Sequence, residues 1–582
     1  MWETSSLEVQ TNWGYIGQVF GSLEVVHSWG LFMLKYEALL ENLNEQIETM
    51  LPRQVMDAGR EDYGGFVSDG IAGATNVSAV STLGYAYLLE GGRYYQSEEI
   101  LARILAGAAF ARKIRRESGC FDLITTNFDS SPDTGFLVEG LAPVVRAARK
   151  AGDDGAGQIA EVLGEIIQTA VPGMIAGGFH TPNHRWVLVA ALSQALELFP
   201  DLDGMDTIES YLAETIDNNA DGEYIERSAG TYNAICNRAL RLASDALNRP
   251  QLLEPVRQNL DLSYHMLHAD GTVVTSFSRR QDHGTRVVLV GMVDSYYNMA
   301  RREENGFYAA VADWLYAISP GGLPWALEPF LTHPEWRVDN LEREPLPESY
   351  ARVYPTAQLW RVRREKTSAT AGAGITSPFG VKHGDVELAS VNLCASYFSI
   401  AQFSGETFEE VDGKIRMTHI SRSTDGGRPG YDLPLGREVA FEEFYNLRKE
   451  RDVYALPPLT TVLEIEEVDS GFNLHVKSEG YDRVPFQIAC DFVPGGELDF
   501  DSGIVRGQAA EVAFLKSGYA TYHINNDAIS IGPGAYAHRF WALRGSESAP
   551  TAFRVLMTFT TPVDHLLEIR CGTWSAAEEK LV

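Results

Sequence analysis

An asparagine and a histidine at the start of one predicted helix are the first residues whose side chains could take part in a reaction. Thr181 suits an N-cap and Pro182 suits the first turn of a helix running to Leu198, which places Asn183 and His184 in that turn. Unpaired N–H groups and the positive end of the helix dipole favour an anion there and disfavour protonation of a histidine. We therefore expect a neutral His184, the form that can act as a base.

A tyrosine at the start of a later helix is the second chemical feature. An Asp-Gly turn signal at 221–222 and the breaker Gly230 predict a helix with Tyr232 at its mouth. A phenol can both donate and accept a proton, but its ordinary pKa near 10 must be lowered if it is to act as a base. A neighbouring arginine lowers such a pKa, and we expect Arg227 or Arg238 to do so.

This arrangement resembles the heparinase II/III-like superfamily of polysaccharide lyases. The resemblance rests on an Asn-His pair opening one helix and an Asp-Gly, Glu, Ser, Tyr run opening another about 50 residues later, and it extends from about Ala79 to the C-terminus. It implies a uronate-containing polysaccharide or oligosaccharide as substrate and cleavage by β-elimination. By the same analogy Asn183 neutralises the uronate carboxylate, while His184 and Tyr232 handle protons.

The residue types fit the demands of that reaction. In β-elimination a base removes the proton α to the carboxylate, and the oxygen at C4 leaves with a proton from an acid. The α-proton is very weakly acidic until the carboxylate charge is screened. One well-placed donor such as the Asn183 amide can contribute about 3–4 kcal/mol to stabilising the developing charge.

The resemblance also implies a further histidine from the sheet domain. His383, in the run 382–385 before a strongly alternating segment, is our candidate, and we predict that it reaches the cluster of Asn183, His184 and Tyr232 directly or through one water. His283 is the alternative, because we expect it to open a helix inside the helical domain.

Charged and polar side chains near these positions are candidates for substrate binding. We expect Glu226 to orient a neighbour by hydrogen bonding and Ser228 to cap a helix, while arginines suit carboxylates or sulfates. The simpler interpretation makes each of them a helix-start, packing or solvent-facing residue. The candidate substrate-binding residues are Arg185, Glu226, Arg227, Arg279, Arg280 and His283.

The resemblance implies no required cofactor. Some relatives carry a structural divalent metal in the sheet domain through histidine and carboxylate ligands. Here Asp385 stands where the second histidine would be expected, and no His-x-His or His-Glu-x-x-His spacing occurs. The sequence thus disfavours a metal.

Composition limits the class of protein. The chain has 582 residues, a hydrophobic content of 45% and a formal net charge of -31, which predict two large folded domains and exclude non-specific nucleic-acid binding. An anionic substrate would need a local basic cleft. Five scattered cysteines without Cys-x-x-Cys spacing are expected to be reduced core thiols. The N-terminus lacks a signal pattern and no apolar run approaches membrane-spanning length, so we expect a cytoplasmic protein, with a removed signal peptide as the alternative.

The hydrophobic period changes along the chain. Helical spacing dominates from 79 to 318, which predicts an (α/α) toroid, with a helical solenoid as the alternative. A Pro-rich connector at 319–349 leads to an antiparallel β-sandwich at 350–582, and residues 1–78 are expected to pack on the toroid. The interval Gly405 to Leu456 breaks the strand rhythm and suits either a functional loop or a mobile insertion.

Two other functions fit parts of this pattern. A toroidal glycoside hydrolase would need two opposed carboxylates, for which Asp221 and Glu226 are the candidates. A glycan-binding protein would bind oligosaccharide without turnover. Neither the substrate within the uronate glycans nor the oligomeric state follows from the sequence.

Overall fold

The computed structural model describes residues 33–73, 75–320, 324–422, 429–501, 503–578 and 580–582. By its contacts the chain divides into residues 1–33 and a compact unit of residues 34–582, and the description below concerns the second unit. Residues 1–32 and 74 of the predicted N-terminal segment 1–78 lie outside the described residues. Its described part begins with a helix.

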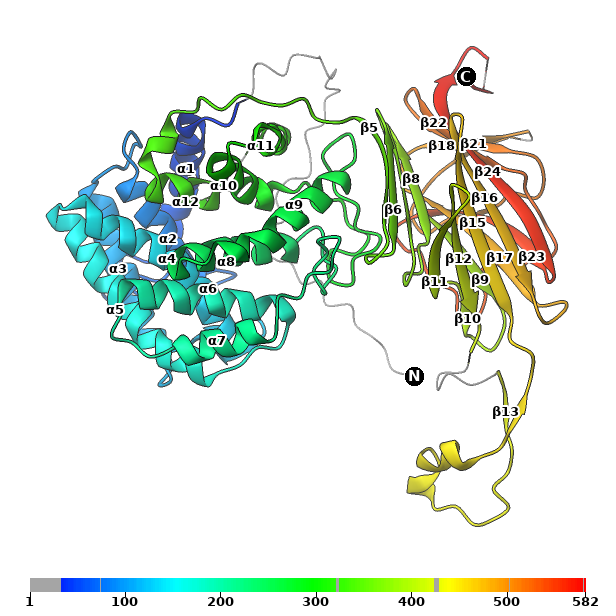
Figure 1. The fold of residues 1–582 in the computed structure, drawn as a ribbon, viewed down its shortest axis with the longest axis horizontal. Helices are drawn as coiled ribbons and strands as arrows, with labels where there is room; N and C mark the ends of the chain where they lie inside the picture. Colours follow the sequence, from blue (N-terminus) through cyan, green and yellow to red (C-terminus); the bar gives the residue numbers. More distant parts are fainter. Residues whose placement is uncertain (1–32, 74, 321–323, 423–428, 502, 579) are drawn as a thin grey trace. The chain divides into compact units, whose positions relative to one another are not determined.

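Helices dominate the first half of this unit (Figure 1). They are α1 (Tyr36–Met50), α2 (Thr75–Leu88), α3 (Glu98–Ile114), α4 (Ser131–Ala151), α5 (Asp154–Ala176), α6 (Pro182–Leu198), α7 (Met205–Ala213), α8 (Tyr232–Leu247), α9 (Glu254–His265), α10 (Val293–Glu303), α11 (Gly306–Ile318) and α12 (Pro324–Thr332). Short 3-10 turns follow or precede several of them, and two small hairpins, β1–β2 (Val67–Ser68, Ile71–Ala72) and β3–β4 (Phe121–Leu123, Asn127–Ser130), lie between helices.

The even-numbered helices form a closed ring. Helix α2 packs on α4, α4 on α6, α6 on α8, α8 on α10 and α10 on α12, and α12 returns to α2 and α4. The odd-numbered helices pack outside, as α3 does on α2 and α5 on α4. A solenoid would leave its first and last helices apart, so this closure confirms the predicted (α/α) toroid. Helix α12, which completes the ring, lies within the stretch that we predicted to be a connector.

One predicted helix begins later than its sequence suggested. We expected His283 to open a helix, but the next helix, α10, starts at Val293 after the 3-10 turn Val290–Met292. The intervening backbone pairs with another segment instead, because Thr272 bridges Val288 and the Val273 N–H donates to Val287. His283 therefore opens no helix, contrary to our prediction.

Helix α5 is long and apolar enough by composition alone to cross a membrane, with 23 residues and a mean hydropathy of 1.3. Our expectation that no apolar run approaches this length was wrong for α5. Half of the apolar window is buried within the protein, where α5 packs on α3, α4 and α6. These contacts account for its apolar surface as that of a core helix.

Two antiparallel sheets packed face to face form the second half. The first has the strand order β20-β23-β17-β9-β8-β7-β6-β5, with β10 beside β9, and the second has the order β11-β12-β15-β16-β24-β22-β21-β18-β19, with β25 beside β24. All described pairs in them are antiparallel except β20 with β23. Alternate residues of both inner faces share one apolar core. This confirms the predicted sandwich.

The strands of the first sheet are β5 (Ser349–Tyr354), β6 (Leu359–Arg364), β7 (Thr367–Gly372), β8 (Phe379–His383), β9 (Val386–Ala395), β10 (Ala401–Gln402), β17 (Pro485–Phe492), β20 (Val512–Phe514) and β23 (Phe553–Thr560). Those of the second are β11 (Thr407–Val411), β12 (Lys414–Ile420), β15 (Thr460–Val468), β16 (Gly471–Glu479), β18 (Glu497–Phe500), β19 (Gly503–Arg506), β21 (Ala520–Ile524), β22 (Asp527–Gly532), β24 (Val563–Ser575) and β25 (Lys580–Leu581).

The interval Gly405 to Leu456 is more ordered than we predicted. It supplies β11 and β12 to the second sheet and then a projecting hairpin, β13 (Gly430–Asp432) with β14 (Val453–Ala455). Its high content of glycine and charge hid these strands. The five cysteines are buried and free, as expected of core thiols.

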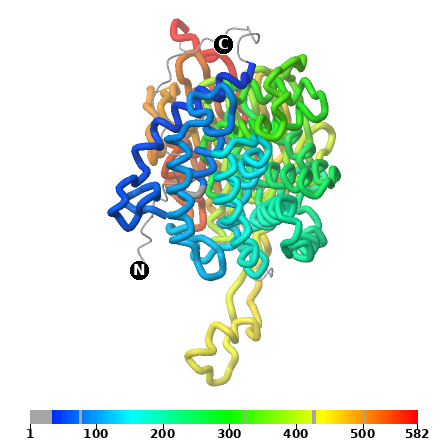
Figure 2. Tube along the Cα trace, turned by 90° about the vertical axis from the view of Figure 1, so that its left-hand side faces the viewer, coloured from blue at the N-terminus to red at the C-terminus, as the bar shows by residue number. Residues whose placement is uncertain are grey.

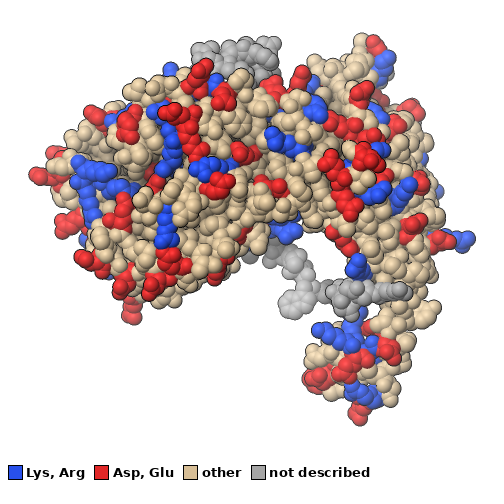
Figure 3. All heavy atoms as spheres, in the orientation of Figure 1, with Lys and Arg blue, Asp and Glu red and all other residues tan. Residues whose placement is uncertain are grey.

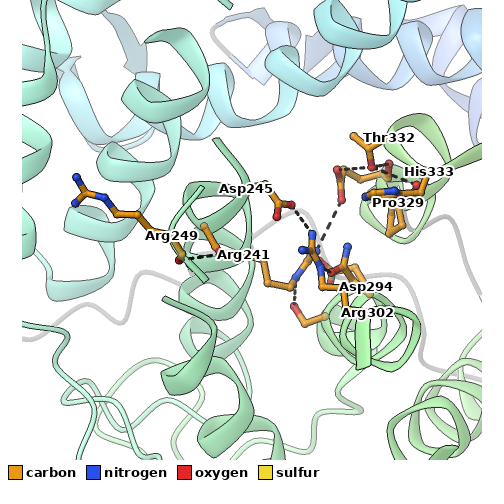
Figure 4. Close-up of polar contacts among 12 residues, drawn as sticks. Arg241, Asp245, Arg249, Asp294, Arg302, Pro329, Thr332 and His333 are labelled. Atoms are coloured by element: carbon orange, nitrogen blue, oxygen red, sulfur yellow. Dashed lines mark hydrogen bonds and ion pairs between the residues drawn. The ribbon is translucent and has the colours of Figure 1, made fainter. Parts of the chain in front are cut away.

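Polar side chains of α8, α10 and α12 contact one another within the ring (Figure 4). Arg241, 1% exposed, donates to Asp294 at 2.7 Å, while Arg302 pairs with Asp245. Buried charges are costly unless they are paired and hydrogen-bonded. The buried pair of Arg241 with Asp294 therefore favours α8 and α10 as neighbours in the ring.

A buried arginine of the first sheet holds the two domains together. Arg361 of β6 is fully buried and donates to the carbonyl oxygens of His265 at 2.9 Å and Leu267 at 2.8 Å, both at the end of α9, and to Thr370 at 3.0 Å. An unmade buried hydrogen bond costs the full desolvation of the group left behind. Arg361 thereby fixes the sheet against the helical domain.

Replacing this arginine should destabilise the protein strongly. Arg361→Ala removes a donor from the buried carbonyl groups of His265 and Leu267, of which only His265 keeps another donor in the described chain, the Tyr350 hydroxyl, so we expect the free energy of unfolding to fall by about 2–5 kcal/mol in chemical denaturation. Arg364→Ala is the matched control, because Arg364 lies on the same strand, is 44% exposed and pairs with Glu467, an interaction worth about 1 kcal/mol or less. Equal losses in the two variants would contradict the role of Arg361.

Candidate active site

The N-termini of α6 and α8 meet through a buried glutamate. Glu226 Oε1 accepts from the backbone N–H of Asn183 at 3.0 Å and from its side-chain Nδ2 at 2.8 Å. Helix α6 begins at Pro182 and α8 begins at Tyr232, as predicted. The expectation that Glu226 orients a neighbour is confirmed, and that neighbour is Asn183.

Asn183 is more deeply placed than we predicted. Its side chain has no exposed surface, and its amide also donates to Thr181 Oγ1 at 3.3 Å. A substrate carboxylate cannot touch it in this arrangement, because Glu226 already occupies the amide. Asn183 and Glu226 hold each other in position, so the expected direct contact of Asn183 with a substrate carboxylate would require Glu226 to move.

His184 lies in the same buried layer and is neutral. Burial lowers its pKa to about 4, and the positive charge that His180 can carry acts in the same direction. The two imidazole rings meet edge to face with centroids 4.7 Å apart, and Phe136 packs on the other side. His184 Nδ1 has no hydrogen-bond partner within the described part of the chain. A neutral, unpartnered imidazole nitrogen is what the sequence led us to expect of a base.

Tyr232 is partly exposed, unlike Asn183 and His184. Its hydroxyl donates to Gln281 Oε1 at 3.2 Å, and its backbone N–H donates to Ser228 Oγ at 3.2 Å, which confirms Ser228 as a cap. The guanidinium of Arg280 lies over the Tyr232 ring, 5.0 Å from its centroid. Arg280 Nε is also 3.8 Å from Glu226 Oε2. Tyr232, Arg280, Glu226 and Asn183 thus form one connected unit.

A single carboxylate holds the segment that carries Arg280 and Gln281. Asp282 accepts from Ser228 Oγ, from the Gly230 N–H and from Ser278 Oγ, each at 2.9 Å. It ties this segment to the turn before α8 and so sets the distance between Arg280 and Tyr232. From the run 278–284 we proposed Arg279, Arg280 and His283 as candidates; the density of hydrogen-bonding residues in this run was the signal for Gln281 and Asp282.

Two arginines make other contacts than we expected. Arg227 pairs with Glu223 at 3.0 Å and donates to the Ala357 carbonyl, and Arg238 pairs with Asp294 and lies over Trp325. Neither contacts Tyr232, so the prediction that one of them tunes the tyrosine was wrong. The guanidinium that lies over the Tyr232 ring is that of Arg280, because the polypeptide returns to the cluster after α9.

Arg185 and Arg279 differ in their freedom to bind a ligand. Arg185 is 11% exposed and pairs with Glu214 and Asp217, which leaves little of its guanidinium for a substrate. Arg279 is exposed beside Arg280, and only its backbone N–H, which donates to the Arg227 carbonyl, has a hydrogen-bond partner in the described chain. Arg279 and Arg280 are therefore the basic groups available at the mouth of the cluster.

The prediction for His383 was wrong. Its Nδ1 lies 2.7 Å from Thr367 Oγ1 and its Nε2 faces Asp527 of the second sheet at 3.9 Å. Successive side chains of a strand point to opposite faces, and the preceding Lys382 pairs with Asp270 of the helical domain. The helical domain is therefore contacted by Lys382, and His383 faces away from it.

His283 does not replace it in the cluster. It is exposed, with Nδ1 2.9 Å from the Ser278 carbonyl, and it lines a cavity of about 270 Å³ between the helical domain and the first sheet. His268, which we did not single out, lines the same cavity, and burial holds the pKa of its imidazole well below the ordinary value. Asn183, His184 and Tyr232 line neither this cavity nor the second described one.

The residues of the cluster do not suit a metal. Within the described ranges no group of three or more His, Cys, Asp or Glu side chains is placed to hold an ion. The donors at the mouth are a phenol, an amide and two guanidinium groups. These suit proton transfer to or from a substrate that carries a carboxylate.

Comparison with known proteins shows the fold. No family model matches the sequence, and no curated protein matches it. Among solved structures, heparinase III matches with a TM-score of 0.53 and 11% identity over 95% of this chain and 88% of that one. A second heparinase III has a TM-score of 0.51, 8% identity, and coverage of 94% of this chain and 86% of that one. A Paenibacillus xanthan lyase matches with a TM-score of 0.53 and 10% identity. The match covers 93% of this chain and 58% of the xanthan lyase chain. The chain shares the fold of these lyases, as the resemblance in its sequence implied.

The buried state of His184 should make stability depend on pH. Its folded pKa of about 4 lies below the ordinary value of 6.5, so the unfolded chain binds its proton first and stability falls as pH drops from 6.5 towards 4. Between pH 7 and pH 5 we expect the free energy of unfolding to fall by about 2 kcal/mol more in the wild type than in His184→Gln. Urea denaturation at the two pH values measures this difference.

His180→Gln is the matched control, because His180 is the exposed neighbour of His184. It should retain most of the pH dependence of the wild type. A His184→Gln variant with the same pH dependence as the wild type would contradict the buried neutral state.

Proposed function

We propose that this protein is a polysaccharide lyase that cleaves a uronate-containing glycan by β-elimination. The observation that carries the proposal is the Tyr232 hydroxyl at the start of α8 with the Arg280 guanidinium over its ring. A guanidinium in this position can screen the carboxylate of a bound uronate, and a phenol beside it can take or return the proton. The shared fold with heparinase III and xanthan lyase supports the same reaction class.

The roles differ from those first implied by the sequence. Tyr232 and neutral His184 remain the proton-transfer candidates, while Arg280, with Arg279 beside it, takes the carboxylate-binding role that we expected of Asn183. Asn183 positions Glu226, and Glu226 in turn faces Arg280 at 3.8 Å. The site needs no cofactor for this chemistry, and the partner is an anionic polysaccharide or oligosaccharide.

Glycoside hydrolysis fits the geometry less well. It requires two opposed carboxylates with access to the scissile bond. Asp221 Oδ2 accepts the backbone N–H groups of Thr356 at 2.7 Å and Ala357 at 2.9 Å, and Glu226 accepts both N–H groups of Asn183. Both candidate carboxylates are thus engaged in holding the structure.

A panel of uronate glycans tests the proposal directly. Only elimination produces an unsaturated uronyl end that absorbs in the ultraviolet, so absorbance should rise with time for at least one glycan of the panel. Chain cleavage without this absorbance would favour the hydrolase. Saturable binding with no change in product would favour a glycan-binding protein.

We expect the Tyr232 hydroxyl to contribute strongly to kcat. Tyr232→Phe removes the hydroxyl and retains the ring, so we expect kcat to fall by at least about 100-fold while the melting temperature changes little. Tyr95→Phe is the matched control, because Tyr95 is an exposed tyrosine of the helical domain. Full activity of the Tyr232 variant would remove it from the mechanism.

The arginine over the tyrosine should contribute through the substrate carboxylate. A hydrogen bond to a charged group is worth about 1.5–3 kcal/mol, so Arg280→Met should lower kcat/KM by about 10- to 100-fold. Arg286→Met serves as control, since Arg286 is 46% exposed and pairs with Glu387 at 2.6 Å. An equal effect in both variants would mean that general surface charge, and not this contact, binds the substrate.

A further inference from the structure

A hairpin arm projects from the sheet domain and packs on little of its own chain. We define the arm as residues 430–455; it contains β13, two 3-10 turns (Phe441–Glu443 and Asn446–Glu450) and β14. Figures 1 and 2 show it extending away from the sandwich. Its stem is held by the pairing of β13 with β14 and by a ring contact between Tyr431 and Phe398, with centroids 5.4 Å apart.

The arm exposes an unusual amount of aromatic surface. Phe441 is 91% exposed, Tyr445 82% and Phe444 53%, while Tyr431 and Tyr454 of the stem are each 61% exposed. A two-stranded hairpin is marginally stable without further packing. Contiguous exposed apolar surface on a folded protein marks an interaction site, and tyrosine and phenylalanine are enriched at such sites. The composition of the exposed surface of the arm is therefore typical of a protein–protein interface.

A second exposed aromatic patch lies on the body of the sheet domain. We call residues 536–544 the receiving patch; within it Trp541 is 69% exposed, Phe540 54% and Tyr536 37%. The segment is fixed beside the first sheet, since the Phe540 carbonyl accepts from Gln487 of β17 and the Ala537 N–H donates to Thr558 of β23. A rigid backbone thus presents these rings to solvent.

The two patches differ in charge: the arm carries six acidic and four basic side chains, and the receiving patch carries two arginines and no acidic residue. Glu438, Glu442 and Glu443 surround Phe441 on the arm, and Glu438 and Glu442 have no hydrogen-bond or ion-pair partner in the part of the chain that the structure describes. Arg539 and Arg544 flank Trp541 and, over the same described residues, also have none. Figure 3 shows charges of both signs over the arm. Complementary charges around apolar centres favour association of the correct pair.

We propose that the arm of one copy docks on the receiving patch of a second copy, and that the second copy returns the same contact. The described arm makes no hydrogen bond or ion pair with residues 536–544 of its own chain. Because every chain carries both the acidic aromatic arm and the basic aromatic patch, two reciprocal contacts close a twofold dimer and leave neither patch exposed. The proposal is independent of the reaction that the protein catalyses.

Light scattering and sedimentation over a concentration series test the dimer. The wild type should be dimeric, and Phe441→Ser should shift it towards monomer because the most exposed ring of the arm loses its contact. Reversing charges sharpens the test. The arm variant Glu442→Arg/Glu443→Arg and the patch variant Arg539→Glu/Arg544→Glu should each raise the dimer Kd by at least about 100-fold, since like charges then face each other.

Mixing the variants distinguishes this contact from other causes. An equimolar mixture of the arm variant and the patch variant restores opposite charges at both contacts, so it should form dimers, as should one chain with all four substitutions. Glu409→Arg/Glu410→Arg is the matched control, because these glutamates are exposed on β11, outside both patches. It should dimerise like the wild type.

Three results would overturn the proposal. The first is a wild type that stays monomeric at every concentration, and the second is a dimer that persists in both charge-reversed variants. The third is a monomeric protein whose arm variant alone loses retention on an immobilised glycan, which would make the glycan the occupant of the arm.

Discussion

The buried carboxylate of Glu226 is the interaction on which the site depends. It accepts both the backbone and the side-chain N–H of Asn183, and its second oxygen faces Arg280 at 3.8 Å. A carboxylate 5% exposed is costly unless donors surround it, so its position fixes the N-terminus of α6, the turn before α8 and the arginine together. Asp282 does the same for Tyr232 by joining the segment of Arg280 and Gln281 to the turn before α8.

The site therefore has two layers with different tasks. Asn183, His184 and Glu226 form a buried layer, in which Asn183 and Glu226 fix each other's position and burial keeps the histidine neutral. Tyr232 and Arg280 are partly exposed, and in our proposal they meet the substrate, with His184 as a second candidate for proton transfer. Preorganised charges contribute most to catalysis when they need not move during the reaction. The closed helical ring and the buried Arg361 supply that rigidity by fixing the helices and the sheet domain.

Local signals made much of this structure predictable. Helical and alternating periods indicated the toroid and the sandwich, and the Thr-Pro and Gly-Thr-Tyr sequences located the starts of α6 and α8. Long-range contacts were not predictable in the same way. Nothing near Tyr232 in sequence shows that Arg280 covers its ring, because that contact depends on the return of the chain after α9. For His383 the error was one of strand register, since a shift by one residue reverses the face and Lys382 takes the inward position. The burial of Asn183 likewise depends on Glu226, 43 residues away.

The central claim is that the cluster around Tyr232 cleaves a glycan without adding water. Digestion of a uronate glycan in heavy-oxygen water, followed by mass spectrometry of the fragments, tests this most directly. Elimination breaks the bond between C4 and its oxygen with loss of a proton, so one fragment must be lighter by one water than its hydrolytic counterpart, and neither fragment should contain heavy oxygen from the solvent at the cleaved bond. Incorporation of one heavy oxygen per cleavage, with fragments of full hydrolytic mass, would contradict the account.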